Sequence, residues 1–330
     1  NLNDRHLYAV STTAANTVTD LGLITRPATC PDTDFRPFAL GLDETNTLYV
    51  GAVCSNASAT SSTGAPSAIV LKYDGAGFSE VLNFSLLFNS QSFWKNWNDE
   101  LVPGYAAHSV SLYQPLLSAL VFDGKDLILA FRNRAWEIGY VPGGSNPTTS
   151  HVLKACWNGA TWALENNGTC GGVLGALPSY SVTTEAGPGG GYFFDMRDSL
   201  ATYGGQPVIN AMGSLAIVPG RGMLATLADP NYLISGGITH LNLANGSRSM
   251  PYEIFRGTAD GSNGSGISGY FGKTSGLGDL ELLLDTAPIE IGNRVWLDTD
   301  SDGIQDAGEA GIDNVDVVLT CGANTATTKT

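Results

Sequence analysis

Short apolar runs alternate with polar turns along most of the chain, and helical periodicity is almost absent. Six pairs of apolar runs, each pair joined by a polar turn, follow one another as three couples: 38–51 with 68–78, 118–131 with 152–162, and 213–227 with 237–246. The runs are rich in β-branched residues and leucine, and the turns are rich in Gly, Asn and Asp, which is typical of antiparallel hairpins. The pattern predicts an all-β fold built from four-stranded units.

The two ends of this region extend the pattern. Residues 276–284 begin a fourth unit, and the apolar runs at 7–10 and 18–24 are expected to form its outer pair. Four-stranded units in series, with the N-terminus completing the last one, predict a β-propeller over residues 1–285. A large irregular β-sandwich is the alternative. Long insertions at 86–115 and 166–210 leave the number of blades open.

An acidic loop at residues 298–309 is the clearest motif. Carboxylates stand at loop positions 1, 3, 5, 9 and 12, with glycine at position 6, the ligand spacing of a calcium-binding EF-hand loop. Ca²⁺ is a hard cation that takes oxygen ligands, so the sequence predicts a calcium site here. Its predicted ligands are the side chains of Asp298, Asp300, Asp302, Asp306 and Glu309 and the main-chain carbonyl of Ile304. A solvated acidic loop is the alternative.

The runs that flank this loop differ from those of an EF-hand. Residues 289–297 and 315–320 are β-branched and apolar, so they predict strands where an EF-hand has helices. The segment from Ile289 to about Thr320 resembles the opening of an SdrD B-like repeat, the Cna-B-type immunoglobulin-like module of bacterial surface proteins. Such a sandwich has roughly 100 residues. Residues 286–330 are therefore expected to hold only its first strands.

A second resemblance concerns the larger region. Residues 1–8, 36–51 and 271–281 resemble the propeller-like region that precedes SdrD B-like repeats in large secreted bacterial proteins. The resemblance implies a bacterial origin, an extracellular or cell-surface location, and a propeller that extends before Asn1.

Five cysteines occur, none in the C-x-x-C spacing of a metal site. Cys30 and Cys54 flank a strand-rich segment, and Cys156 and Cys170 flank a predicted hairpin, so we predict the disulfides Cys30–Cys54 and Cys156–Cys170. Cys321 is left over, with a partner expected in the missing part of its module. The alternative is five free thiols.

Charge and composition narrow the range of partners. The net charge of −15 argues against a nucleic-acid partner, because phosphate binding needs a basic face. No apolar run reaches the length of a membrane span. Five N-x-S/T tripeptides are candidate glycosylation acceptors, although such tripeptides also arise by chance in a chain rich in Asn and Ser: Asn56, Asn83, Asn167, Asn245 and Asn263.

The chain carries no catalytic motif that we recognise, and its four histidines are dispersed. An aromatic insertion with Trp94, Trp97 and Tyr105 suits a sugar or a protein partner, because long loops on a rigid scaffold commonly carry binding. The alternative, which we favour, is that these rings plug their own blade.

The sequence as a whole indicates a non-enzymatic, extracellular structural or adhesive surface protein. A propeller would display binding loops on a calcium-stiffened stalk, with other copies of itself, cell-surface or matrix components, or a glycan as partners. If the strand after Val315 pairs with a neighbouring subunit, fibres or a surface layer would result. The alternative is a propeller-fold glycan hydrolase or lyase, which two carboxylates and an aromatic platform in the central channel would favour.

Overall fold

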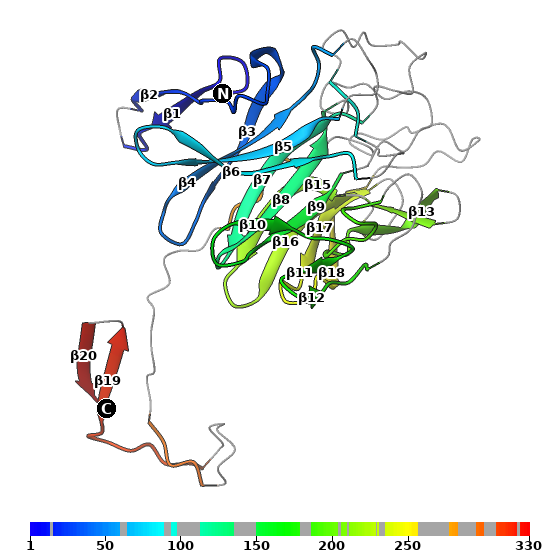
Figure 1. Cartoon of the computed structure of the whole chain (residues 1–330). Helices are drawn as coiled ribbons and strands as arrows, with labels where there is room; N and C mark the ends of the chain where they lie inside the picture. Colours follow the sequence, from blue (N-terminus) through cyan, green and yellow to red (C-terminus); the bar gives the residue numbers. More distant parts are fainter. Residues whose placement is uncertain are drawn as a thin grey trace. The chain divides into compact units, whose positions relative to one another are not determined.

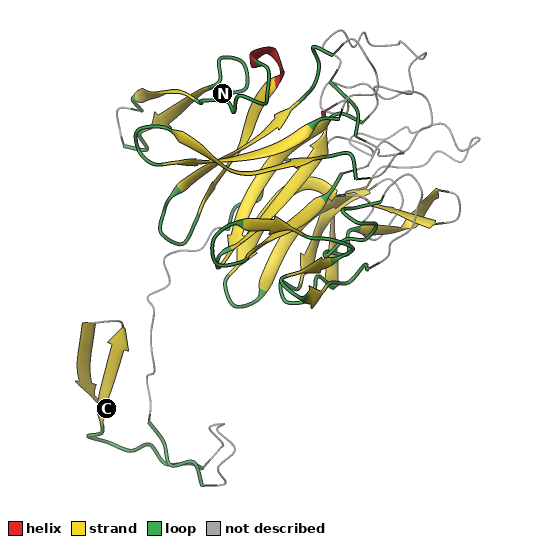
Figure 2. Cartoon of the chain, viewed as in Figure 1, coloured by secondary structure: helices red, strands yellow, loops and turns green. Residues whose placement is uncertain are grey.

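The computed structural model confirms an all-β chain (Figure 2). The chain divides into two compact units, residues 1–282 and 283–330. No helix in the described ranges is long and apolar enough to cross a membrane. The structure describes residues 1–13, 16–59, 65–88, 94–97, 113–134, 150–178, 186–203, 206–209, 211–228, 230, 235–256, 277–282, 295–299, 308–321 and 324–330.

Three antiparallel four-stranded sheets form the unit 1–282, each with its strands in chain order (Figure 1). The first contains β3 (Phe35–Leu42), β4 (Leu48–Cys54), β5 (Ser67–Tyr73) and β6 (Phe78–Ser85). The second contains β7 (Pro115–Asp123), β8 (Asp126–Asn133), β9 (Val152–Trp157) and β10 (Trp162–Leu164). The third contains β15 (Ala211–Val218), β16 (Gly222–Ala228), β17 (Ser235–Leu241) and β18 (Arg248–Arg256).

The first strands of these sheets pack together, with β7 in contact with both β3 and β15. Gly41 and Gly51 make the approach of the first sheet to β7 possible, because a Cβ at either position would run into Leu120 or Leu117. Strands β4 and β8 are buried along nearly their whole length, so both faces of these sheets are covered. The three units predicted from the sequence are thus observed. Closure into a propeller lies outside the described residues and stays a prediction.

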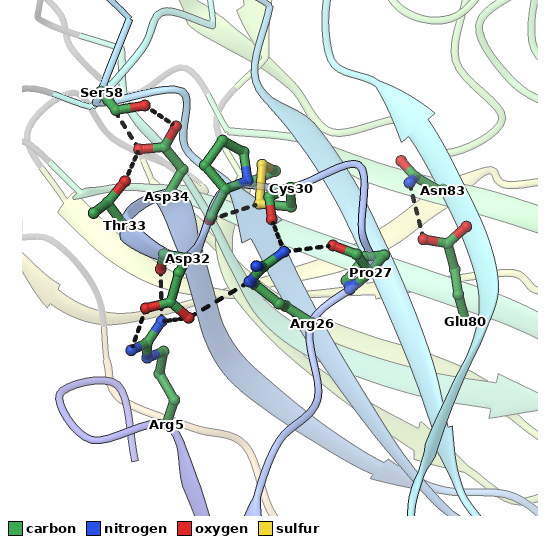
Figure 3. Close-up of a disulfide and its surroundings, with 12 residues drawn as sticks. Arg5, Arg26, Pro27, Cys30, Asp32, Thr33, Asp34, Ser58, Glu80 and Asn83 are labelled. Carbon is green, nitrogen blue, oxygen red and sulfur yellow. Dashed lines mark hydrogen bonds and ion pairs between the residues drawn. A yellow bond between two sulfur atoms is a disulfide. The ribbon is translucent and has the colours of Figure 1, made fainter.

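The N-terminal pair is placed differently from the expectation. Strands β1 (His6–Val10) and β2 (Val18–Leu23) form a two-stranded sheet of their own. Leu7 is buried in one cluster with Phe35 and other residues of the first sheet. The guanidinium of Arg5 also pairs with Asp32 at 2.8 Å (Figure 3). Packing against the first sheet, rather than strand pairing with 277–282, therefore positions this pair.

Residues 277–282 lie against the second and third sheets without forming a strand. The carbonyl of Gly278 accepts hydrogen bonds from Arg132 of β8, at 3.1 Å, and from the hydroxyl of Ser214 of β15. Of the segment 276–284 that was expected to begin a fourth unit, the described residues 277–282 form no strand. The remaining short strands of this unit are β11 (Thr169–Cys170), β12 (Val173–Leu174), β13 (Arg197–Tyr203) and β14 (Gln206–Ile209), and the 3-10 turn η1 spans Asp32–Asp34.

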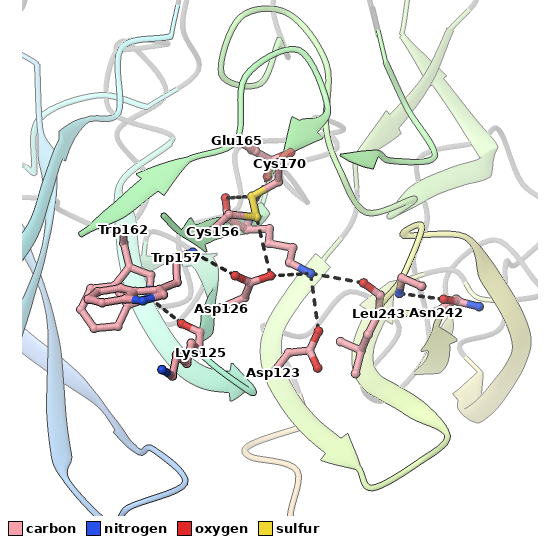
Figure 4. Close-up of polar contacts among 12 residues, drawn as sticks. Asp123, Lys125, Asp126, Cys156, Trp157, Trp162, Glu165, Cys170, Asn242 and Leu243 are labelled. Carbon is pink, nitrogen blue, oxygen red and sulfur yellow. Dashed lines mark hydrogen bonds and ion pairs between the residues drawn. A yellow bond between two sulfur atoms is a disulfide. The ribbon is translucent and has the colours of Figure 1, made fainter. Parts of the chain in front are cut away.

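Two disulfides join the pairs that the sequence predicts. Cys30 bonds to Cys54 at the end of β4, and Cys156 of β9 bonds to Cys170 of β11 (Figures 3 and 4). Each closes a short loop beside a buried strand, and such a cross-link stabilises a domain by about 3 kcal/mol. Cys321 is the last residue of β19.

The unit 283–330 has two pieces of antiparallel pairing. Strands β19 (Asp316–Cys321) and β20 (Asn324–Lys329) form a hairpin, and Trp296 forms a bridge with Gly311. Strand β19 thus pairs with β20 of its own chain along one edge, and strand addition from a neighbouring subunit stays a prediction. Nearly all described side chains of this unit are at least partly exposed, and the exception is Glu309.

Candidate functional site

The acidic loop is closed at its base by extended chain. Besides the bridge between Trp296 and Gly311, the N–H of Leu297 donates to the carbonyl of Ala310 at 2.9 Å, and the N–H of Ile312 donates to that of Val295 at 2.8 Å. The flanking runs are therefore paired antiparallel, as their β-branched composition predicts. This pairing brings the first and last residues of the loop to the same end.

Glu309, at the last position of the loop, is 8% exposed. Its Oε1 accepts hydrogen bonds from the N–H and the hydroxyl of Thr299, at 2.8 and 3.1 Å. The carboxylate is thereby held across the loop, one residue beyond the half-buried Asp298. Removing a carboxylate from water costs free energy that hydrogen bonds or a cation must offset.

These observations fit a calcium ion as far as the described residues reach. Asp298 and Glu309, the two ends of the predicted ligand set, are brought together by the bridge. Asp300, Asp302, Ile304 and Asp306 lie outside the described residues. The donor set remains five carboxylates and one carbonyl, the oxygen chemistry that Ca²⁺ prefers.

The burial of Trp94 and Trp97 decides between the two interpretations of the aromatic insertion. Trp94 is 1% exposed and Trp97 is 4% exposed, so neither indole lies on a surface loop. The indole N–H of Trp97 donates to the carbonyl of Pro115 at 2.7 Å, while Arg36 and Arg134 lie against the ring at 5.2 and 4.5 Å from its centroid. The alternative, in which the rings fill their own scaffold, describes both tryptophans. Tyr105 lies outside the described residues.

Trp94 belongs to a buried row of hydrogen-bonded side chains that the sequence did not predict. Its indole N–H donates to Nδ1 of His151 at 3.1 Å, so Nε2 carries the ring hydrogen and faces the hydroxyl of Tyr192 at 3.0 Å. Burial lowers the pKa of His151 to about 3, and the ring is therefore neutral at physiological pH. All three side chains are buried. These hydrogen bonds fasten the segment 94–97 to the residue just before β9 and to the segment around Tyr192.

A second buried network centres on Lys154 of β9, and its partners Asp123, Asp126 and Leu243 are labelled in Figure 4. Its ammonium lies 3.2 Å from Asp126 and 3.5 Å from Asp123, and it donates to the carbonyl of Leu243 at 3.3 Å. The cation is paired, as a buried charge must be, and it ties the second sheet to the turn after β17. Sequence periodicity gives no signal for it, because Lys154 stands in an apolar strand.

Nearby, both carboxyl oxygens of Glu165 accept backbone N–H groups, from Lys154 at 2.9 Å and from Phe193. Burial raises the pKa of Glu165 to about 8. The side chain is 1% exposed, so no substrate reaches it. Both networks hold the scaffold together and neither supplies an accessible catalytic group.

An open groove with a volume of about 810 Å³ lies in the larger unit. The first strands of the three sheets and residues 279–282 line it. Its walls are mostly apolar, with Phe38 and Phe122 among them, and Asp279 and Glu281 are its two carboxylates. Both carboxylates are exposed to solvent.

Comparison with known proteins assigns the C-terminal segment. Residues 289–330 match the family profile of the SdrD B-like domain, which confirms the resemblance drawn from the acidic loop and its flanks. Colossin-C of Dictyostelium discoideum is 32% identical over 301 residues, which is 85% of this chain and 28% of that protein. Colossin-B of the same organism is 28% identical over 326 residues, or 89% of this chain and 8% of that protein.

The chain thus spans less than a third of the length of these relatives. They come from an organism that is not a bacterium, so the comparisons do not support the predicted bacterial origin. A solved protein of unknown function from Dyadobacter fermentans aligns over 78% of this chain and 61% of its own, with 12% identity and a TM-score of 0.37. That score is too low to carry an argument.

Proposed function

We propose that this chain is a non-enzymatic, extracellular structural protein in which the unit 283–330 is a module stiffened by calcium. One observation carries the proposal. The buried side chain among the described residues of that unit is a carboxylate, Glu309, and it stands where a calcium loop closes. A module organised around a carboxylate gains its order from a cation where other modules gain it from apolar packing.

The charge of the loop supports this role. Five carboxylates within twelve residues repel one another, and a divalent cation removes that repulsion. Extracellular calcium modules bind with dissociation constants of about 10⁻⁴–10⁻³ M. Calcium at millimolar concentration would therefore hold the loop closed and stiffen the connection to the larger unit.

The unit 1–282 supports an extracellular location. Its two disulfides need an oxidising compartment. We propose that this unit is a rigid scaffold that displays its loops to cell-surface or matrix components, in line with the resemblance to secreted proteins noted from the sequence.

Calorimetric titration of the whole chain with calcium, together with limited proteolysis in calcium and in chelator, tests the proposal. We expect binding in the range above and slower cleavage within 283–330 when calcium is present. Asp300→Ala should abolish both effects. Asp313→Ala, an exposed aspartate just outside the loop, is the matched control and should preserve them. Equal cleavage with and without calcium in the wild type would overturn the proposal.

A second candidate, the glycan-active enzyme, rests on the groove. Asp279 and Glu281 line it together with Phe38 and Phe122, which supplies two carboxylates and an aromatic wall. Solvent reaches both carboxylates, so neither has the enclosed setting typical of a catalytic general acid. We expect no hydrolysis or elimination on a panel of polysaccharides. If a polysaccharide is turned over, and if Asp279→Asn and Glu281→Gln each abolish the turnover, the enzyme becomes the preferred function in place of the structural protein.

A further inference from the structure

Four of the five N-x-S/T tripeptides fall in the described residues, and they differ sharply in their surroundings. Asn83 and Asn245 are exposed, while Asn56 and Asn167 are half-buried. A chain that forms disulfides during secretion meets the glycosylation machinery in the same compartment where a eukaryotic cell produces it. The folded structure must then accommodate every sugar that was added.

Asn83 lies on β6, the outermost strand of the first sheet. Its amide nitrogen donates to the carboxylate of Glu80 at 3.0 Å, within the same exposed strand (Figure 3). An N-linked asparagine keeps one amide hydrogen, so a sugar at Asn83 leaves this contact available. The third residue of the tripeptide, Ser85, is also exposed.

Asn245 lies in the tight turn after β17. Gly246 fixes the turn from the inside: its φ is +69°, and a Cβ there would collide with the backbone of Phe193. The carbonyl of Gly246 also accepts the N–H of Asp195 at 2.9 Å. On the outer side, the side-chain oxygen of Asn245 accepts the N–H of Ser247 at 3.0 Å, which leaves the amide nitrogen for a sugar.

Asn56 has the opposite setting. Its amide nitrogen donates inward to Asn96 at 3.1 Å, next to the buried Trp97. The hydroxyl and the N–H of Ser58 in this tripeptide are held by the buried carboxylate of Asp34, at 2.7 and 2.8 Å (Figure 3). The difference from Asn83 is burial: Asn56 is half-buried, so a sugar on it would have to extend past the segment 94–97 that the two tryptophans anchor.

Asn167 is confined by a neighbouring turn. Its N–H donates to the carbonyl of Pro188 at 2.6 Å, and a Cβ on Gly189 would collide with Asn166 and with the backbone of Asn167. The following Gly168 is buried against the backbone of Tyr192. The turn at 187–190 thus covers the position from which a glycan would extend.

We propose that Asn83 and Asn245 carry N-linked glycans in a eukaryotic secretory pathway, and that Asn56 and Asn167 stay unmodified. The inference rests on the secreted location within the proposed function. It requires neither the calcium site nor the binding role. Asn263 lies outside the described residues and is not assigned.

The test is to secrete the whole chain from a mammalian cell line behind a cleavable signal peptide. Peptide mapping after treatment with peptide-N-glycosidase F then reads each tripeptide separately, because release of the glycan converts the asparagine to aspartate. We expect near-complete occupancy at Asn83 and Asn245, at least tenfold above that at Asn56 and Asn167. Asn83→Gln and Asn245→Gln should each remove one glycan from the intact mass, and the matched Asn56→Gln and Asn167→Gln should remove none.

Two outcomes would overturn the proposal: bare Asn83 and Asn245 in protein whose disulfides have formed, or occupancy at Asn56 or Asn167 equal to theirs. Non-reducing peptide mapping of the same sample reports whether Cys30–Cys54 and Cys156–Cys170 are bonded. Bonded cysteines with bare asparagines would reject glycosylation and leave the secreted location standing.

Discussion

The two units of this chain differ in the interactions that stabilise each of them internally. In the unit 1–282, whole strands such as β8 are buried, and two disulfides reinforce the sheets. In the described part of the unit 283–330, hydrophobic side chains such as Leu297 and Val318 are 55% and 56% exposed, and the buried side chain is a carboxylate. A two-stranded hairpin is marginally stable in water by itself. Apolar burial among the described residues of the smaller unit is thus slight, and in the function proposed above calcium bound by the acidic loop supplies the missing stability.

Because the two units are stabilised differently, substitutions in one unit should leave the other unit unchanged. Core and disulfide changes should act on the larger unit and leave calcium binding intact. Changes in the loop should act on the smaller unit and leave the larger one intact.

The largest effect is expected from the apolar core. Phe131 of β8 is fully buried against Trp94 and Phe84. Phe131→Ala should lower the free energy of unfolding of the larger unit by about 3–5 kcal/mol, because it removes buried surface and leaves a cavity. Urea denaturation followed by fluorescence measures this. Phe38→Ala, at a ring that is 47% exposed, is the control and should cost far less. A calcium affinity that falls with Phe131→Ala would contradict the independence of the two units.

Removal of one disulfide should have the next largest effect. The Cys30–Cys54 bridge spans a sequence separation of 24. Cys30→Ser combined with Cys54→Ser should destabilise the larger unit by about 3 kcal/mol, because the unfolded chain regains the freedom that the bridge removes. Differential scanning calorimetry in calcium and in chelator measures the change. Wild-type protein treated with reductant is the control and should lose more stability, because Cys156–Cys170 is reduced as well. A loss confined to chelator would show that the smaller unit had been altered instead.

The calcium loop should give a smaller, concentration-dependent effect. Glu309→Gln keeps the size of the side chain but removes a charged ligand that closes the loop. At a calcium concentration about one hundred times the dissociation constant, binding stabilises the folded module by about 2.7 kcal/mol, and the variant should lose most of this. Calcium titration and proteolysis of residues 283–330 report it. Glu281→Gln, an exposed glutamate outside the loop, should change neither. Retention of wild-type affinity by Glu309→Gln would remove this residue from the ligand set.

Local patterns predicted much of this architecture. Alternating apolar runs identified the three four-stranded sheets, and cysteine positions around hairpins identified both disulfides. The resemblance of residues 289–320 to an SdrD B-like repeat identified the C-terminal domain. The burial of Trp94 and Trp97 was not predictable in the same way, because their partners His151 and Pro115 are distant in the sequence. The place of β1 and β2 was missed for the same reason: the packing of Leu7 and the pairing of Arg5 with Asp32 decide it.

The effect that is smallest per step, at about 1.4 kcal/mol for each pH unit, concerns His151 and separates the units by pH. Its pKa is about 3 in the folded unit and near 6.5 when unfolded, because burial disfavours the charged ring. A depressed pKa stabilises the fold above pH 6.5, and this contribution is lost as the pH falls toward 3. The free energy of unfolding should drop by about 1.4 kcal/mol per pH unit in that window, because unfolding takes up one proton. Nuclear magnetic resonance of the imidazole should show the neutral tautomer with hydrogen on Nε2 down to pH 5. His151→Gln should flatten the dependence, while His240→Gln, outside this network, should retain it. An imidazole of His151 that titrates near pH 6.5 would show that the row from Trp94 to Tyr192 is open to water, and the larger unit would then lack the dry interior that distinguishes it from the smaller one.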